Sequence, residues 1–276
     1  MTKVLVVGSS STIAEHFCQE SVQAFDVVTA SSSKISDLKI DFLNFQLPDI
    51  SGKQLTHAII FSSATDIKQI EEDFYSAKAL TLSGPIKLIN KLNQEGVKCM
   101  VISTTAVFDE VSTETTEKSN TSPSTTYGHL KLELERLTLE NPLNAVMRIT
   151  KVFSGNSILN KWKDLLNDGK EISCFEDLRV APLPLEFISK ALISWILRSY
   201  HGVSHISPDK DMSYYELGLH LSKKMGHSGL KVKKCKTSES IRYKPRKAYL
   251  DCQCQHSRTY SLQNCIEIVV KELLKV

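Results

Sequence analysis

Residues 3–14, with the sequence KVLVVGSSSTIA, decide the fold of this chain. The run from Lys3 to Val7 is short, apolar and rich in β-branched side chains, which is typical of a fully buried parallel strand. Gly8 ends the run, and the apolar positions of residues 11–18 then fall on one face of a helix. The turn between strand and helix is where backbone amides and a helix dipole can hold a dinucleotide pyrophosphate. We therefore expect a dinucleotide to contact Gly8, Ser10, Ser11, Thr12 and Ile13.

The glycine pattern of this turn is incomplete. Gly8 is present, whereas Ser11 and Ala14 occupy the other two glycine positions of the dinucleotide-binding fingerprint. Small residues still permit a close backbone approach, but an ordinary strand-to-helix turn explains the stretch equally well when it is taken alone.

The same alternation of strand and helix continues through the first half of the chain. We predict strands at residues 25–30, 57–61, 98–103 and 144–149, and helices at 67–92, with a break at Gly84-Pro85, and at 126–139. Such alternation implies a parallel sheet covered on both faces, with ligands bound beyond the carboxyl ends of the strands. The predicted fold class is α/β, a Rossmann-type doubly wound parallel sheet with a smaller C-terminal substrate-binding lobe.

We divide the chain at the end of this alternation. Residues 1–155 are expected to form the dinucleotide-binding domain, and residues 156–276 mostly the second lobe, with some segments returning to the Rossmann core. The second half is predicted to contain helices at 160–167, 185–199 and 262–274, strands at 171–174 and 202–206, and a capping box at 213–216 that opens a helix to about 225. Residues 231–234 alternate like an exposed edge strand, and the polar stretch 112–126 is a candidate lid.

Composition excludes several classes of protein. The chain has 276 residues, 41% hydrophobic and 24% charged, and its net charge of +3 is too balanced for a nucleic-acid binder. No apolar run approaches the roughly 18 residues of a membrane span. The seven cysteines are scattered and no secretory signal is visible, so we expect reduced thiols in a cytoplasmic protein. Cys252, Cys254 and His256 lack a fourth ligand at a recognised spacing, and we expect no metal site.

Two features of the sequence could take part in acid–base chemistry, a Tyr–Lys pair on a predicted helix and hydroxyl residues at the end of a predicted strand. Tyr127 and Lys131 are four residues apart and therefore share a helix face. A nearby lysine cation lowers the pKa of a tyrosine, whose phenol can then exchange a proton with a carbonyl or an alcohol. Ser103, Thr104 and Thr105 stand at the end of the strand at 98–103, where a hydroxyl can reach a substrate oxygen. Each signal is weak alone, because a Tyr-x-x-x-Lys pair is common on helix surfaces and a strand-end threonine is often a cap.

The order of these signals resembles the extended short-chain dehydrogenase/reductase superfamily, and more closely the dTDP-4-dehydrorhamnose reductase family. The segments that carry the resemblance are Ser83-Gly84-Pro85, VISTTAVFD at 101–109, Tyr127 with Lys131, MRIT at 147–150, EDLRVAP at 176–182, GVSHI at 202–206 and KPRKAYLD at 244–251. The resemblance implies an NAD(P)-dependent oxidoreductase that reduces the C4 ketone of a nucleotide-linked 4-keto-6-deoxysugar, in surface polysaccharide or deoxysugar biosynthesis.

The resemblance also implies roles for individual residues. Tyr127 would give its proton to the C4 ketone, Lys131 would lower the pKa of Tyr127 and hold the nicotinamide ribose, and Thr104 would bond the C4 oxygen. The expected partner is a nucleotide-sugar substrate, and a homodimer is a candidate assembly. The expected substrate contacts are Thr104, Thr105, Arg179 and Arg246.

The identity of the nicotinamide depends on the end of the strand at 25–30. An acid there would bond the ribose of NAD, but the chain continues with Ser31, Ser32, Ser33 and Lys34, which suit a 2′-phosphate. NADP is therefore favoured over NAD. The remaining expected cofactor contacts are Asp41, Phe42, Ser62, Ser63, Ala64 and Lys131.

Several positions differ from the motifs of the reductase family, and these differences narrow the range of reactions that we expect. Thr81 stands where the family usually has an asparagine, which in many relatives helps to place a backbone kink and an active-site water, and Ser62-Ser63-Ala64 replaces an Asn/Cys-Ala-Ala loop. No acidic pair follows Thr104, which argues against a sugar 4,6-dehydratase. Cys99 lies at the start of its strand, so epimerase chemistry is not indicated. The alternative is a non-catalytic nucleotide-binding regulatory subunit of the same fold, as in the β subunit of methionine adenosyltransferase.

Overall fold

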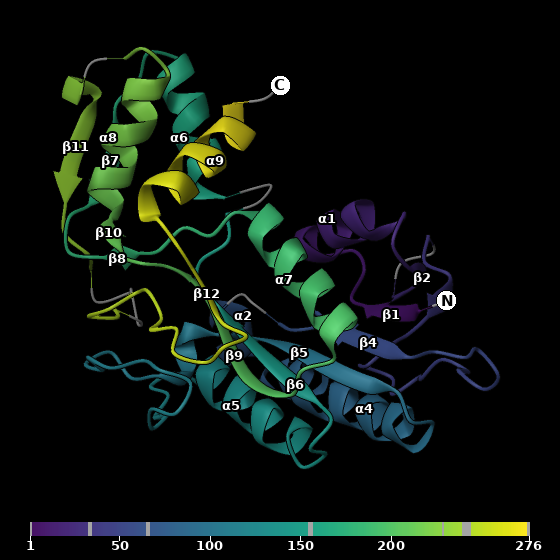
Figure 1. The fold of residues 1–276 in the computed structure, drawn as a ribbon. Coiled ribbons are helices and arrows are strands. Elements are labelled where there is room, and N and C mark those ends of the chain that lie inside the picture. The colour runs from purple at the N-terminus through teal and green to yellow at the C-terminus, as the bar shows by residue number, and fades with distance from the viewer. Residues whose placement is uncertain are drawn as a thin grey trace.

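An eight-stranded parallel sheet forms the centre of the molecule, with the strand order β12-β9-β6-β5-β4-β1-β2-β3 (Figure 1). The structure is a computed structural model that describes residues 2–32, 35–64, 67–153, 157–227, 229–238 and 244–274. Every neighbouring pair of strands in the sheet is parallel, which confirms the predicted fold class. The strands are β1 Lys3–Val7, β2 Asp26–Ser31, β3 Leu38–Lys39, β4 His57–Ile60, β5 Lys98–Thr104, β6 Ala145–Ile149, β9 Gly202–Pro208 and β12 Arg258–Tyr260.

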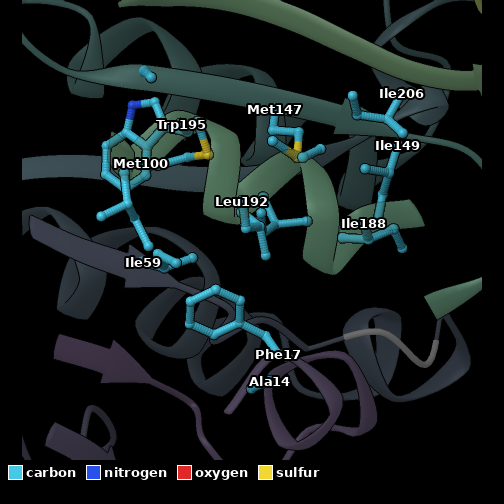
Figure 2. Close-up of a cluster of buried hydrophobic side chains, with 14 of the residues drawn as sticks. Ala14, Phe17, Ile59, Met100, Met147, Ile149, Ile188, Leu192, Trp195 and Ile206 are labelled. Atoms are coloured by element: carbon cyan, nitrogen blue, oxygen red, sulfur yellow. The ribbon is translucent and has the colours of Figure 1, made fainter. Parts of the chain in front are cut away.

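Helices cover both faces of this sheet. Helices α1 (Thr12–Ser21) and α7 (Leu185–Arg198) pack on one face, and α4 (Gly84–Gln94) and α5 (Thr126–Thr138) pack on the other (Figure 1). Because successive side chains of a strand point to opposite faces, β1 contributes residues alternately to the two cores. Figure 2 shows the core beneath α1 and α7, where Phe17 and Trp195 are fully buried.

The stretch predicted as a helix at 67–92 with a break at Gly84-Pro85 is helical, and α4 does begin at Gly84, but the stretch is divided further than predicted before that residue. It consists of α2 Ile67–Glu72, α3 Phe74–Lys78, the π-helical turn η1 Ala79–Ser83 and α4. Asp73 caps α3 by accepting the N–H of Ser76 at 3.0 Å, which starts a new helix after α2. Gly84 begins α4 against the ring of Phe42, and a Cβ at Gly84 would lie 2.5 Å from that ring.

A second lobe has its own hydrophobic core. It contains α6 Ile158–Asn167, β7 Ile172–Phe175, α8 Tyr214–Lys224, η3 Gly229–Lys231, β11 Val232–Cys235 and α9 Leu262–Leu274. The capping box of α8 is present as predicted, with Ser213 and Glu216 bonded reciprocally. The short strands β8 Arg179–Val180 and β10 Met212–Ser213 pair antiparallel. The 3-10 turn η2 Thr105–Val107 follows β5.

Candidate active site

The expected cofactor turn lies at the carboxyl ends of β1 and β4. Gly8 has φ +77, and a Cβ there would lie 2.9 Å from the backbone nitrogen of Ser62 in the loop after β4. This backbone conformation is unstrained for glycine and unfavourable for other residues. Gly8 therefore lets the first turn approach Ser62 closely.

The start of α1 presents amide groups at this turn. Ser11 caps the helix, because its hydroxyl accepts the N–H of Ala14 at 3.3 Å and its carbonyl accepts the N–H of Glu15 at 2.9 Å. The amides of Thr12 and Ile13 have no carbonyl four residues back within the helix. A pyrophosphate fits this arrangement, since the helix dipole favours an anion and no side chain at Gly8 fills the turn.

The end of β2 differs from the expectation drawn from the sequence. Ser31 is buried and Ser32 is exposed, while Ser33 and Lys34 lie outside the described residues. Asp37 accepts the N–H of Thr29 at 2.8 Å and its hydroxyl at 2.7 Å, and these hydrogen bonds hold the pKa of the carboxyl below its usual range. An acid therefore lies beside β2 after all, but it is bonded to the strand itself.

Asp41 and Phe42 make internal contacts that account for both side chains. The carboxylate of Asp41 accepts the backbone N–H groups of Leu43 and Asn44, as in an Asx turn. Phe42 is buried among the residues that pack against α4. Their expected contact with a cofactor stays a prediction.

Thr104 and Ser103 have opposite environments at the end of β5. Thr104 is partly exposed and its hydroxyl accepts the N–H of Ala106 at 3.2 Å, and among the described residues it donates to none. Ser103 is buried on the opposite face of the strand and donates to Glu135 of α5. Thr104 is therefore the hydroxyl that can reach a ligand.

Tyr127 and Lys131 lie in the first half of α5. Thr125 caps the helix by accepting the N–H of Gly128, and a Cβ at Gly128 would lie 2.2 Å from the carbonyl oxygen of Ala106. This glycine brings the start of α5 against η2, next to Thr104. Burial raises the pKa of Tyr127, and hydrogen bonding to Ser63 opposes the shift.

Lys131 is almost entirely buried and is charged at neutral pH. Its ammonium donates to the carbonyl of Ile102 at 2.5 Å. Burial lowers the pKa of Lys131 to about 8, while the nearby carboxylate of Glu135 raises it. We expected Lys131 to lower the pKa of Tyr127, but in this structure burial outweighs any such effect.

Thr81 connects the π-helical turn η1 to the loop after β4. Its hydroxyl accepts the N–H of Ala64 at 3.0 Å and lies 3.4 Å from the hydroxyl of Ser63. Ser63 in turn faces Tyr127. The irregular turn is therefore present although Thr81 replaces the usual asparagine, and π-helical turns of this kind occur frequently at functional sites.

A buried polar network beneath this region was not predicted from the sequence. Glu135 is paired with Arg148 at 2.7 Å, and Arg148 lies 3.4 Å from a ring nitrogen of His205. His205 lies 3.8 Å from Glu117, which belongs to the candidate lid. The spacing of Lys131 and Glu135 on one helix face was an available signal, but the cross-strand partners were not visible in the sequence.

The expected substrate residues lie on segments beside this network. Arg179 is bonded to Asp211 through two of its nitrogens, at 3.0 and 2.5 Å. Arg246 is exposed, and its backbone N–H donates to the carbonyl of Glu110. Asp251 accepts the backbone N–H of Thr115 at 2.9 Å, so the segment 244–251 runs beside the candidate lid. Thr105 is partly buried at the start of η2.

Two structural findings concern sites of other kinds. Within the described ranges, no helix is both long enough and apolar enough to cross a membrane. In the same part of the chain, no three His, Cys, Asp or Glu side chains gather in a group that could hold a metal ion. All seven cysteines are free thiols, and Cys99 is buried near the start of β5, away from Thr104.

Comparison with known proteins identifies the family and the fold of the chain. A model of the family described as the RmlD substrate binding domain matches residues 2–272. The dTDP-4-dehydrorhamnose reductase of Bacillus anthracis str. Ames, solved with NADP, shares 19% identity over 99% of both chains, with a TM-score of 0.84. The corresponding reductase of Clostridium acetobutylicum ATCC 824 shares 18% identity over 100% of both chains, with a TM-score of 0.80.

Other activities occur on the same fold. The UDP-N-acetylglucosamine 4-epimerase of Methanobrevibacter ruminantium M1, solved with UDP-N-acetylmuramic acid, has a TM-score of 0.81 and 15% identity over 99% of this chain and 97% of its own. No curated protein sequence matches the chain. At these identities the structural similarity establishes the fold, and the reaction has to be argued from the site.

Proposed function

The chain belongs to the RmlD substrate binding domain family, and from this premise we propose that it is an NADP-dependent reductase of the C4 ketone of a nucleotide-linked 4-keto-6-deoxysugar. The observation that carries the proposal is the arrangement around the end of β5. Thr104 presents a hydroxyl there, and Gly128 brings the helix with Tyr127 and Lys131 against the turn that follows. A hydroxyl, a phenol and an ammonium together can bind and protonate a carbonyl oxygen.

Each of these side chains has a definite task in the proposed reaction. The raised pKa of Tyr127 keeps its proton on the phenol at neutral pH, so Tyr127 is a proton donor. Thr104 donates a hydrogen bond to the ketone oxygen as negative charge develops on it. Lys131, charged below about pH 8, stabilises the tyrosinate that remains after proton transfer.

The nicotinamide supplies the hydride when it is bound, and the chain supplies orientation and charge. The residues proposed to hold the dinucleotide are the turn 8–13, the loop Ser62-Ser63-Ala64 and Lys131. Transfer of a hydride to C4 and of the Tyr127 proton to the ketone oxygen converts the ketone into an alcohol. Ser63 and Thr81, which are within hydrogen-bonding range of each other, are suited to hold the loop that faces Tyr127.

We favour NADP because β2 ends in serines and the nearest acid, Asp37, is already bonded to Thr29. Nicotinamide fluorescence titrations should show tighter binding of NADPH than of NADH. Lys34→Ala should weaken NADPH binding by about 1.5–3 kcal/mol and leave NADH unchanged, since it removes a charge-assisted contact. Lys39→Ala, in the neighbouring strand β3, is the matched control. Equal binding of the two dinucleotides would overturn this preference.

The second lobe is proposed to bind the nucleotide part of the substrate, together with residues 244–251. The free thiols support a cytoplasmic location. Whether the protein forms a homodimer is to be measured by light scattering of the purified chain.

The reaction is tested directly with deuterated NADPH and a panel of dTDP-, UDP- and GDP-4-keto-6-deoxysugars. Incorporation of deuterium at C4 of one sugar is the expected result. If no sugar is reduced while nucleotide still binds, the regulatory-subunit function replaces the proposed one.

A further inference from the structure

A row of polar side chains crosses three neighbouring strands beneath α5. The register pairs Ser103 of β5 with Arg148 of β6, and Arg148 with His205 of β9. Registered residues of parallel strands point to the same face, and two residues earlier the same row consists of Val101, Val146 and Val203. The sheet surface under α5 therefore changes from apolar to charged as it approaches the candidate active site.

Glu135 is the residue of α5 that faces this row. Arg148 donates to both of its carboxylate oxygens, through Nε at 3.1 and 3.2 Å and through Nη2 at 2.7 Å. Ser103 donates to the same carboxylate from β5. Glu135 and Arg148 are both at least 95% buried, so these bonds hold the carboxylate in one place.

Lys131 lies one helical turn before Glu135 and is also buried. The groups that face its ammonium are the carbonyl of Ile102 on β5 and the carboxylate of Glu135, while Tyr127 lies one turn earlier on α5. Arg148 on β6 faces the far side of Glu135. A buried ammonium beside one neutral carbonyl loses its proton readily, and a fixed carboxylate opposes that loss.

We propose that Glu135 is a positioning residue of the reductase: clamped by Arg148 and Ser103 one helical turn after Lys131, its carboxylate keeps the ammonium of Lys131 charged. The importance of this residue for turnover rests on the proposed function, whereas its effect on Lys131 does not. A buried ion pair contributes little to stability compared with a well-packed apolar pair. Glu135 lies on the same face of α5 as Lys131, one turn further on, so its negative charge acts on the ammonium.

The test measures the protonation of Lys131 without any substrate. Protein with ¹³C-labelled lysine is titrated by NMR from neutral to strongly alkaline pH, and the Lys131 signal is assigned by its loss in Lys131→Met. In the unaltered protein the pKa is expected at about 8. In Glu135→Gln it should fall by about one pH unit or more, because an opposite charge has been removed.

Two further variants separate this effect from loss of structure. Glu133→Gln removes a carboxylate from the same helix, but one that is exposed and paired with Arg136, so the Lys131 titration should not move. Glu135→Gln/Arg148→Met removes both charges of the buried pair, so no guanidinium is left without its carboxylate, and this variant should fold if Glu135→Gln does not. It should lower the pKa of Lys131 in the same way, since Glu135 is the charge that acts on Lys131.

The kinetic readout is the alkaline limb of the pH profile of kcat. It should move to lower pH in Glu135→Gln by the same amount as the Lys131 titration. An unchanged Lys131 pKa in folded Glu135→Gln or in the double variant would overturn the proposal, even if the reductase activity is found. If no keto-sugar is reduced, the proposed function fails while the NMR titration still decides the role of Glu135.

Discussion

The two ends of the central sheet bury polar groups in different ways. At the amino end, His57 begins β4 with its two ring nitrogens at 3.0 Å from the hydroxyls of Thr56 and Ser199, and its ring lies edge-on to Trp195 at 5.1 Å. At the carboxyl end, Lys131, Glu135 and Arg148 are charged groups. The ring of His57 lies under α7 on one face of the sheet, whereas Lys131 and Glu135 belong to α5 on the other face.

The difference shows what a purely structural polar group requires. His57 is satisfied by hydroxyl groups and stays neutral, because burial lowers its pKa to about 4. A neutral, bonded side chain is enough to fill a gap at the edge of a core. At the carboxyl end, three charged groups are buried, and their burial costs desolvation energy. Apolar side chains of similar size would fill the same space without that cost. This difference agrees with the catalytic role that we propose for the carboxyl end.

The largest effect is expected on turnover, from a substitution at the carboxyl end of the sheet alone. Tyr127→Phe removes one phenolic oxygen, so the free energy of unfolding should change by about 1 kcal/mol or less. Turnover of the keto-sugar should fall by roughly 10²–10⁴-fold, which is typical for the loss of a positioned acid. Thermal unfolding and steady-state kinetics on the same preparation measure both quantities. Turnover equal to that of the unaltered protein would show that Tyr127 is not the proton donor.

The second prediction compares single changes at the two ends. Arg148→Met leaves the carboxylate of Glu135 buried without its partner, and the free energy of unfolding should fall by about 3–5 kcal/mol. Ser199→Ala removes one hydroxyl from His57, and its cost should be about 1–3 kcal/mol. Urea unfolding followed by circular dichroism provides both values. Equal losses would contradict the distinction between charged and neutral ends.

A third variant tests how closely α5 must approach β5. In Gly128→Ala the new methyl group would lie 2.2 Å from the carbonyl oxygen of Ala106, so the start of α5 has to shift. Overpacking of this kind costs about 1–3 kcal/mol. Because Tyr127 and Thr104 lie on the two sides of this contact, kcat should fall although neither side chain is changed. Gly128 is helical and has no positive φ, so alanine is compatible with its backbone and the crowding against Ala106 is the expected cause of the loss.

The long strands were predictable, whereas the short ones were not. β1, β4, β5 and β6 are buried on both faces and therefore appear in the sequence as continuous apolar runs. β3 and β12 have two and three residues, which is too short for any periodic pattern. In the stretch 67–92 the Gly84-Pro85 pair predicted the start of α4, whereas the break before α3 was missed because its cap, Asp73, is a single local signal.

Part of the candidate site could likewise be predicted from the sequence, and part could not. Tyr127 and Lys131 follow from their spacing along the chain and Thr104 from the resemblance to the reductase family, and the roles of all three stay predictions until activity is measured. The network of Arg148, His205 and Glu117 depends on the register of three strands and on a loop that returns to them. Contacts between segments that are far apart in the chain cannot be recognised in a single sequence. This part of the site could therefore be identified only from the structure.

The smallest expected effect is on the pH dependence of stability and comes from His57 at the amino end of the sheet. The pKa of His57 is about 4 in the folded protein and near 6.5 when the chain is unfolded. As pH falls below 6.5 the unfolded chain takes up a proton that the folded chain does not, so stability present above that pH is lost progressively down to about pH 4. Between about pH 7 and pH 5 the loss of stability attributable to His57 should be about 1–2 kcal/mol.

The matched control is His57→Gln. His205, His220 and His256 also have lowered pKa values and act in the same direction, and their contributions remain in this variant. The variant should be less stable at neutral pH and should lose less stability on acidification. Parallel pH dependence of the two proteins in urea unfolding would show that His57 is not held neutral at the amino end.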